Sequence, residues 1–240
     1  MIYVVGIGPG DDAFLTEQAR GAIRSADTVI GYGLYTGLIS HLTRGKEVIA
    51  SGMRQEAERC KTALERAKNG ANVALVCGGD AGVYGLAGVM FETARGDPDI
   101  RIEIIPGVTA ACAAAAVLGA PLMHDFAVVS LSDLLTPWET IERRVRAASE
   151  ADFVICLYNP KSAGRAWQFG RAAELMLESR DRATPCGLVR NAGREGQASV
   201  ICGLAELGSQ YVDMFSAVIV GNSRTRVING RMVTPRGYVI

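Results

Sequence analysis

The sequence predicts an α/β protein with two domains, 1–120 and 121–240, in which the first sheet is mostly parallel and the second is mixed. Short β-branched runs alternate with amphipathic helical stretches through the first domain, the pattern of βαβ units. The segment Gly119-Ala-Pro121 is typical of a hinge. Beyond it, the last strand candidates follow one another without helices long enough for crossovers, so part of the second sheet is expected to be antiparallel.

The first domain is expected to hold five strands, each a short apolar run. They are Ile2–Ile7, Thr28–Ile30, Lys46–Ile49, Val73–Val76 and Ile102–Ile105. Between them, helices are expected after Leu15, with Thr16 as N-cap, and over Leu34–Leu42, Gln55–Lys68 and the stretch from Leu86 to the Asp97-Pro98 break. Asn69-Gly70 provides the usual αL-tolerant helix end.

The second domain shows the same kinds of pattern with less regular alternation. Strands are expected at Phe126–Leu131, Phe153–Leu157, Cys186–Val189, Ala198–Ile201, Ala217–Val220 and Arg226–Ile228. Helices are expected over Trp138–Ala148 and Gly164–Leu177, the latter with Ser162 as a possible cap.

Composition limits the classes of function. Hydrophobic residues make up 49% of the 240 residues, which allows a sizeable core, and 25 basic residues balance 25 acidic ones, so no nucleic-acid partner is indicated. The N-terminus lacks a basic n-region and no apolar run is long enough for a membrane span. Six scattered cysteines without a CxxC pair fit buried thiols in a cytoplasmic protein, and no metal site is expected.

Three Gly-rich loops follow three strands of the predicted parallel sheet: Gly6–Asp11, Cys77–Gly85 and Pro106–Ala110. The carboxyl ends of parallel strands share one rim, where open α/β sheets bind ligands. The first loop is not a dinucleotide fingerprint, because Asp11 stands where the third glycine belongs. Asp80 is placed to accept hydrogen bonds from a ligand, or else caps a helix in a tight turn.

No nucleophile–histidine–acid arrangement is visible. The chain has two histidines, His41 and His124. His41 is expected to be a solvated residue near a helix end. His124-Asp125 lies beside the predicted hinge, where a structural role and a functional one are both open.

The loops resemble one family, the tetrapyrrole (corrin and siroheme) methyltransferases, which use S-adenosylmethionine. GIGPGD at Gly6–Asp11, GGDAGVYG at Gly78–Gly85 and PGVTA at Pro106–Ala110 carry the resemblance in order and at specific spacings. Further segments resemble members that methylate C-17 of precorrin-3B. One, SGMRQE at Ser51–Glu56, lies in the first domain, and the others lie in the second half: PLMHDFAVVSLSDLLTPW at Pro121–Trp138, LYNPKS at Leu157–Ser162 and MVTPRGY at Met232–Tyr238. Ala81, where proline is common, departs from the pattern.

The resemblance implies a tetrapyrrole methylase fold with the cofactor in a cleft between the two domains. It assigns S-adenosylmethionine contacts, with S-adenosylhomocysteine as product, to Pro9, Gly78, Gly79, Asp80, Val83, Thr109 and Ala110, and adenine-side contacts to Tyr158 and Ala192. It also implies a homodimer. The substrate is a small-molecule tetrapyrrole, and neither a nucleic acid nor a membrane is an expected partner.

The implied reaction is methylation of precorrin-3B at C-17 with ring contraction to precorrin-4. A sulfonium methyl group is already activated, so alignment of donor and acceptor matters more than a strong base. Arginine suits the acetate and propionate arms of a tetrapyrrole, and Arg54, Arg190 and Arg236 are candidates, each with an ordinary surface role as the alternative. Proton movement during contraction is assigned to His124, Asp125 or Tyr84.

Three alternatives stay open. The substrate can be cobalt-precorrin-3 of the anaerobic pathway, whose enzyme has a nearly indistinguishable sequence. The chain can be a protein or ribosomal RNA methyltransferase of the same fold, although zero net charge weighs against RNA. It can also be a cofactor-binding module without catalytic activity.

Overall fold

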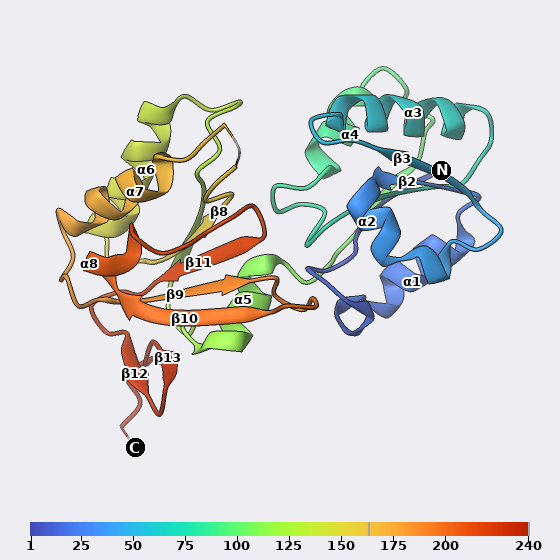
Figure 1. Ribbon diagram of the computed structural model, residues 1–240. Helices are drawn as coiled ribbons and strands as arrows, with labels where there is room; N and C mark the ends of the chain where they lie inside the picture. Colours follow the sequence, from blue (N-terminus) through green and yellow to red (C-terminus); the bar gives the residue numbers. More distant parts are fainter. Residues whose placement is uncertain (163, 240) are drawn as a thin grey trace. The chain divides into compact units, whose positions relative to one another are not determined.

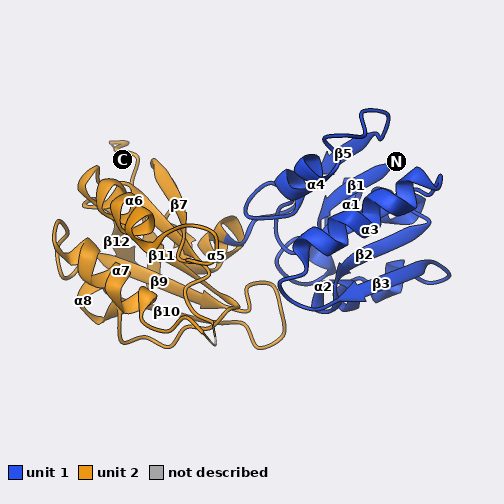
Figure 2. Ribbon diagram, turned by 90° about the horizontal axis from the view of Figure 1, so that it is seen from above, with its two compact units in different colours: residues 1–110 blue, residues 111–240 orange. Residues whose placement is uncertain are grey.

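The computed structural model describes residues 1–162 and 164–239. The chain divides into two compact units, Met1–Ala110 and Ala111–Ile240, coloured separately in Figure 2. The division falls at the start of helix α5 (Ala110–Leu118), ten residues before the expected boundary at residue 120. Helix α5 belongs with the second unit because its Leu118 side chain fills the space above Gly187, where a Cβ would come within 2.7 Å of Leu118 Cδ2.

The first unit is built on a five-stranded sheet in the order β3-β2-β4-β1-β5, and every pairing in it is parallel, as predicted. Its strands are β1 (Ile2–Gly6), β2 (Thr28–Tyr32), β3 (Glu47–Ser51), β4 (Val73–Cys77) and β5 (Ile102–Ile105). Its helices are η1 (Asp12–Phe14), α1 (Glu17–Ser25), α2 (Gly33–Leu38), η2 (Ser40–Leu42), α3 (Glu56–Lys68) and α4 (Ala87–Thr93).

Helices cover both faces of this sheet (Figure 1). Alternate residues of β1 point to opposite sides: Val4 packs in the cluster with α3 and α4, and Val5 packs in the cluster with α1. All five residues of β4 are buried, which explains why its sequence is a continuous apolar run. The predicted cap of the first helix is confirmed, since Thr16 Oγ1 accepts a hydrogen bond from Ala19 N at 3.1 Å.

The second unit holds a mixed five-stranded sheet in the order β10-β9-β11-β8-β7, also as predicted. Strands β7 (Phe126–Ser130), β8 (Val154–Tyr158) and β9 (Pro185–Arg190) run one way, and β10 (Ala198–Gly203) and β11 (Ser216–Val220) run the other. Helices α6 (Trp138–Glu150), α7 (Gln168–Leu177) and α8 (Leu204–Leu207) contribute to one large apolar cluster with this sheet. A small sheet of β12 (Arg226–Ile228), β13 (Arg231–Val233) and β6 (Gly119–Ala120) completes the unit.

A buried cation closes the end of α6. Arg180, 9% exposed, donates to the Ala148 carbonyl at 3.1 Å, to Ser149 Oγ at 2.9 Å and to the carbonyls of Phe153 and Gly221. The Ala148 carbonyl also accepts from Phe153 N at 3.1 Å, so the guanidinium adds a second donor at this helix end and ties it to Phe153 and Gly221. Burial lowers the pKa of Arg180, which nonetheless stays protonated.

Three local predictions were wrong in detail. The helix expected from Gly164 begins at Gln168, because Ser162 and Arg165 pair in an isolated bridge instead of capping it. Gly31 belongs to β2 and does not follow it. The expected hinge at Gly119 is part of β6, which pairs in parallel with β13. No helix in residues 1–162 and 164–239 has the length and apolar character needed to cross a membrane.

Candidate functional site

The three Gly-rich loops of the first unit meet at Gly6, the last residue of β1. Strands β4, β1 and β5 are neighbours, so their carboxyl ends lie side by side. A Cβ built on Gly6 would lie 2.7 Å from Gly79 O, 2.9 Å from Ala81 N and 2.9 Å from Gly107 N. A Cβ on Gly107 would in turn lie 2.7 Å from the Gly6 carbonyl carbon. Only glycine allows this approach, and it brings the backbones of the three loops into contact.

Backbone hydrogen bonds join the first two loops. Gly79 N donates to Gly8 O at 2.8 Å, and Gly8 N donates to Gly79 O at 3.1 Å. Both glycines have positive φ, 76° for Gly8 and 70° for Gly79, which a residue with a side chain seldom adopts. The pairing therefore continues beyond the strands and holds two loops as one surface.

The Asp80 carboxylate joins the second loop to the third. Its Oδ1 accepts from Gly82 N at 2.8 Å and from Val83 N at 3.2 Å, and its Oδ2 accepts from Gly107 N at 3.0 Å. The two bonds on Oδ1 form the tight turn considered from the sequence. The bond on Oδ2 spans 27 positions of the chain and fixes the separation of two loops. Asp80 thus has a structural role in the rim, because its carboxylate binds backbone N–H groups of two loops.

The backbone at Gly79 is less crowded than that at Gly6 and Gly107. A Cβ on Gly79 would make only ordinary contacts, 3.9 Å from Ala110 N and 4.0 Å from Thr109 Cα. The space that this missing side chain leaves is bordered by the third loop, so a ligand can lie against the backbone of Gly79, Thr109 and Ala110 together. Gly78 beside it is closed, because its Cβ would meet the Tyr35 ring at 2.6 Å.

The remaining predicted residues of the first unit lie around this rim. Pro9 is buried in the loop after β1, and Val83 is half-buried. Tyr84 is 56% exposed and has a φ of 54°, an uncommon backbone conformation for a bulky residue. Cys77, which precedes Gly78, is 6% exposed, and burial raises the pKa of its thiol to about 11. The thiol is therefore protonated at neutral pH and is a poor nucleophile.

Arg54 lies farther along the same rim. It follows β3, the edge strand, which β2 separates from β4. Its side chain is exposed and its φ is 60°, again a left-handed backbone. Arg54 therefore lies on the same rim of the sheet as the three loops, but β3, which it follows, is not adjacent to β4, β1 or β5.

In the second unit, Tyr158 and Arg190 end β8 and β9, which run in the same direction with β11 between them. Tyr158 Oη accepts from Ala111 N at 2.8 Å, near the start of α5. The Arg190 guanidinium lies 5.7 Å from the centre of the Tyr211 ring, a cation–π distance. Ala192, 8% exposed, lies two residues after Arg190, so these predicted residues share one edge of the second sheet.

The sequence model of the protein family Tetrapyrrole (Corrin/Porphyrin) Methylases matches residues 1–208. The chain belongs to this family. It is 50% identical over 100% of both chains to the "Probable cobalt-factor III C(17)-methyltransferase" of Salmonella typhimurium. It is also 40% identical to the "Precorrin-3B C(17)-methyltransferase" of Sinorhizobium sp, over 99% of this chain and 96% of that protein.

Solved structures agree with the fold. The crystal structure of the methyltransferase CobJ superposes with a TM-score of 0.92 at 35% identity and covers 98% of this tetrapyrrole methylase and 99% of the other chain. Uroporphyrin-III C-methyl transferase from Thermus thermophilus, solved with S-adenyl homocysteine, has a TM-score of 0.70 at 25% identity, with 92% and 96% covered.

In this tetrapyrrole methylase, His124 and Asp125 lie at the opposite edge of the second sheet from Tyr158, Arg190 and Ala192. They precede β7, whereas Tyr158 ends β8, which runs parallel to β7. A five-residue strand separates the two edges by about 15 Å. Both residues line a hollow of about 230 Å³ together with Arg224. Arg236 belongs to that side as well, since a Cβ on the neighbouring Gly237 would lie 3.5 Å from Arg224 Nη1.

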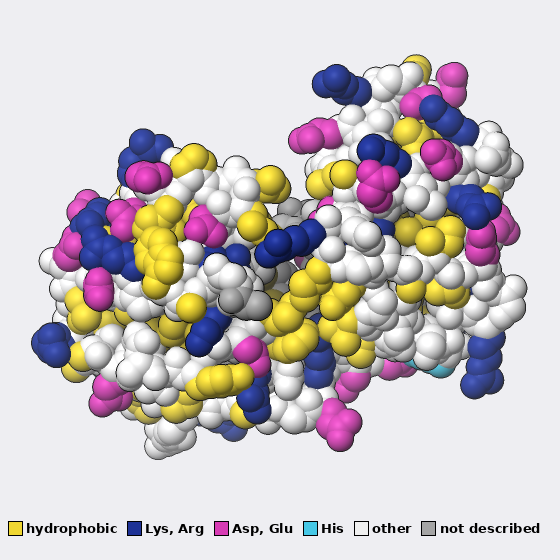
Figure 3. Space-filling view, turned by 45° about the horizontal axis from the view of Figure 1, so that its top comes forward, with side chains coloured by type: hydrophobic (Ala, Val, Ile, Leu, Met, Phe, Trp, Pro, Cys, Tyr) yellow, Lys and Arg dark blue, Asp and Glu magenta, His cyan; other side chains and the backbone are white. Residues whose placement is uncertain are grey.

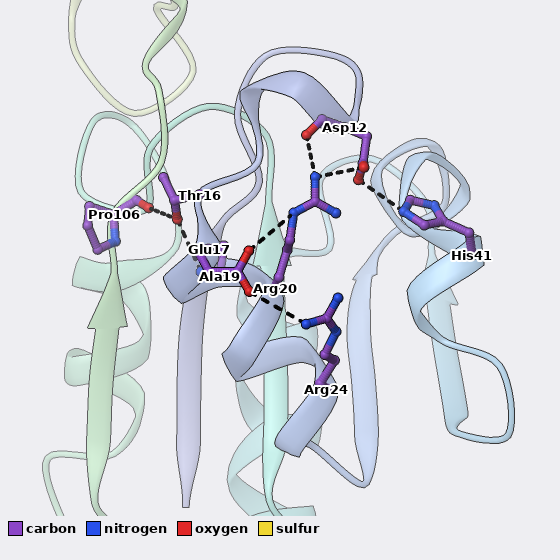
Figure 4. A network of polar contacts seen from close by, with 8 residues as sticks. All are labelled: Asp12, Thr16, Glu17, Ala19, Arg20, Arg24, His41 and Pro106. Atoms are coloured by element: carbon purple, nitrogen blue, oxygen red, sulfur yellow. Dashed lines mark hydrogen bonds and ion pairs between the residues drawn. The ribbon is translucent and has the colours of Figure 1, made fainter.

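A polar network that the sequence analysis did not identify holds the loop after β1 (Figure 4). Arg20 on α1 donates to the Asp12 carbonyl at 2.6 Å and pairs with Asp12 Oδ2 at 2.7 Å. His41 Nε2 lies 3.0 Å from Asp12 Oδ1. The hydrogen bond from Arg20 is the largest cause that lowers the pKa of Asp12. Thr16 Oγ1 adds a 3.4 Å hydrogen bond to the Pro106 carbonyl, which links the first loop to the third.

Sequence reasoning missed this network for a specific reason. Asp12 has two partners that are distant in the sequence: Arg20 lies eight positions away on α1, and His41 lies 29 positions away. The acidic pair Asp11-Asp12 was a visible signal, but only Asp11 has the local role that a motif reveals: its Oδ1 accepts from Ala13 N at 2.9 Å. His41, expected to be merely solvated, pairs with Asp12 while remaining 45% exposed.

Proposed function

We propose that this tetrapyrrole methylase transfers a methyl group from S-adenosylmethionine to C-17 of a precorrin-3-type tetrapyrrole, with contraction of the ring. The observation that carries the proposal is the meeting of the three loops at Gly6, with an uncrowded backbone at Gly79 beside Thr109 and Ala110. The identity of 50% over the full length to a protein named for C(17) methylation supports the position of transfer.

The donor site is proposed on the rim of the first unit. S-adenosylmethionine, when bound, supplies a methyl group on a positively charged sulfur. Backbone groups of Gly79, Thr109 and Ala110 border the open space and are proposed to bind and orient the donor, with Pro9 and Val83 beside them. Asp80 holds the loops at a fixed separation. Because the neighbouring Cys77 thiol stays protonated, it does not compete for the methyl group.

Tyr158 and Ala192 are proposed to contact the adenine side of the donor, and Arg190 a carboxylate of the tetrapyrrole. Arg190 suits that task because its ring contact holds the guanidinium while leaving its N–H groups at the periphery. Of the groups considered for proton movement, we favour Tyr84 over His124 and Asp125, which lie at the far edge of the second sheet from Tyr158.

The proposal leaves one further question about the substrate, which is whether the tetrapyrrole contains cobalt. The identity to the cobalt-factor III protein, 50%, exceeds the 40% identity to the precorrin-3B protein, and we therefore favour the cobalt-containing substrate. The test is to incubate the purified protein with S-adenosylmethionine and each tetrapyrrole in turn, without oxygen, and to follow absorbance and mass. Gain of one methyl group on the cobalt form supports the proposal. Methylation of precorrin-3B alone would reverse the preference, and turnover of neither would refute the function.

The face of the molecule shown in Figure 3 gives no support to a nucleic-acid substrate. On the face shown in Figure 3, Lys and Arg side chains alternate with Asp and Glu, without a continuous basic stripe. Electrostatic binding to phosphates requires such clustering.

The homodimer and the cytoplasmic location stay predictions. Light scattering coupled to size-exclusion chromatography tests the first, with a dimer expected at twice 25.4 kDa. Cell fractionation tests the second.

A further inference from the structure

Two segments that resemble the C-17 members, Pro121–Trp138 and Leu157–Ser162, come together in the second unit. Strands β7 and β8 pair in parallel with Ser130 opposite Tyr158, and Leu131 N donates to Tyr158 O at 2.9 Å. The chain then leaves the sheet at the edge that also carries Arg190. Neither the donor site nor the fold explains the exposed parts of these two segments.

Buried polar side chains hold the loop between β7 and α6. Gln168 Nε2 donates to Asp133 Oδ2 at 2.8 Å, and Arg165 Nη1 donates to Ser132 Oγ at 3.2 Å. Arg165 Nη2 also donates to Asn159 O at 2.9 Å. Arg165 is 7% exposed and Gln168 is 3% exposed. Removing such groups from water is costly unless they are bonded, so the loop is fixed by contacts that depend on its present position.

This fixed loop presents apolar side chains to the outside. Leu134 is 59% exposed and Leu135 is 98% exposed. Trp167, 56% exposed, lies edge-on against Trp138 at 4.9 Å between ring centres. Large apolar side chains that are held in the open next to a buried polar network are typical of a recognition surface.

A cation lies in the same segment. Lys161 is half-buried, and its ammonium group makes no hydrogen bond or ion pair within residues 1–162 and 164–239. A half-buried charge is more costly than one in water, which favours an anionic partner. The surface therefore combines exposed leucine and tryptophan with an ammonium group. This complements a flat apolar molecule with carboxylates at its rim.

We propose that Leu134, Leu135 and Trp167 contact the macrocycle of the tetrapyrrole and that Lys161 pairs with one of its carboxylates. We call these four residues the macrocycle surface. It deepens the proposed function, on which it rests, by naming where the acceptor is recognised. Asp133, Arg165 and Gln168 are positioning residues, since they hold the loop and do not contact the substrate.

The chain offers a direct reporter. Its two tryptophans, Trp138 and Trp167, both lie at the macrocycle surface. A bound tetrapyrrole absorbs where tryptophan emits, so titration with cobalt-factor III is expected to quench the fluorescence. The midpoint of quenching is the quantity to compare between variants, because quenching by energy transfer also occurs at longer range.

The variants are Leu135→Ser and Lys161→Gln, with Val200→Ser as a matched control on β10, where Val200 is 44% exposed. We expect the midpoint to rise about tenfold in each of the first two, the order of one lost apolar contact or ion pair. The control is expected to stay within twofold. Affinity for S-adenosylhomocysteine, measured by calorimetry, is expected to be unchanged in all three, as is the melting temperature.

Quenching midpoints within twofold of the unaltered protein in both variants would overturn the macrocycle surface. Parallel loss of S-adenosylhomocysteine affinity would also overturn it, since it would show a general disturbance. Failure of the proposed function looks different: the unaltered protein would then neither quench nor methylate with either tetrapyrrole. A protein that quenches and responds to the variants but transfers no methyl group would retain the surface and lose the activity.

Discussion

Replacing Asp80 with alanine tests whether one carboxylate sets the geometry of the donor site. The change removes three hydrogen bonds to backbone N–H groups, those of Gly82, Val83 and Gly107. Hydrogen bonds to a charged group contribute about 1.5–3 kcal/mol each. Gly82 is exposed and water replaces that bond, whereas the other two amides are half-buried. The loss of these two bonds is therefore expected to lower the free energy of unfolding by about 3–6 kcal/mol.

The affinity for S-adenosylhomocysteine is expected to fall with it. Without the bond to Gly107, the second and third loops lose their fixed separation, and the ligand must restore it on binding. A cost of about 1.4–2.8 kcal/mol corresponds to a tenfold to hundredfold weaker Kd. Urea unfolding followed by circular dichroism gives the stability, and calorimetric titration gives the Kd.

Two further variants make the result interpretable. Asp80→Asn keeps the shape and one acceptor oxygen, so an intermediate loss is expected in both measurements. Glu92→Ala on α4 removes an exposed carboxylate near the same loop and is expected to change neither. Lower stability with unchanged affinity would refute the link from loop separation to binding. Lower affinity with full stability would show that Asp80 acts on the ligand directly.

Other predictions follow from packing and charge. Gly107→Ala places a methyl group against the Gly6 carbonyl, so a loss of about 1–3 kcal/mol in urea unfolding is expected, whereas Gly88→Ala, with nothing within 4 Å, is expected to be neutral or stabilising. Arg180→Met removes the guanidinium donors to the carbonyls of Phe153 and Gly221, and about 3 kcal/mol of stability is expected to be lost; an unchanged denaturation midpoint would contradict this. The lowered pKa of Asp12 means that its carboxylate stabilises the fold above the ordinary value of 3.8. The gap in melting temperature between the unaltered protein and Asp12→Asn is therefore expected to close as pH falls below that value, and a gap independent of pH would refute it.

The sequence was most informative where the signal is local. Thr16 lies three residues before the amide it caps, and a cap of that kind is visible in the chain. The apolar run Val73–Val76 predicted a buried strand, and all five residues of β4 are buried. Glycine-rich loops after β1, β4 and β5 predicted a shared rim because strand direction alone brings them to one side.

Features that depend on distant partners were not accessible. Gly119 has the appearance of a hinge, but its strand partner, Met232, lies in the last ten residues of the chain. Asp80 also joins the second loop to the third through Gly107 N, and no sequence motif connects these two residues, which are 27 positions apart. The exclusion of His124 from the edge that carries Tyr158 required the pairing of β7 with β8, which sequence patterns did not provide.

Whether the three loops bind the donor can be tested by a nuclear magnetic resonance titration of the ¹⁵N-labelled protein with S-adenosylhomocysteine. We expect the largest amide shifts in residues 1–110 on Gly8, Gly79, Thr109 and Ala110, in the loops that meet at Gly6. Shifts confined to other parts of the chain, such as the hollow beside His124, with these amides unmoved, would contradict it.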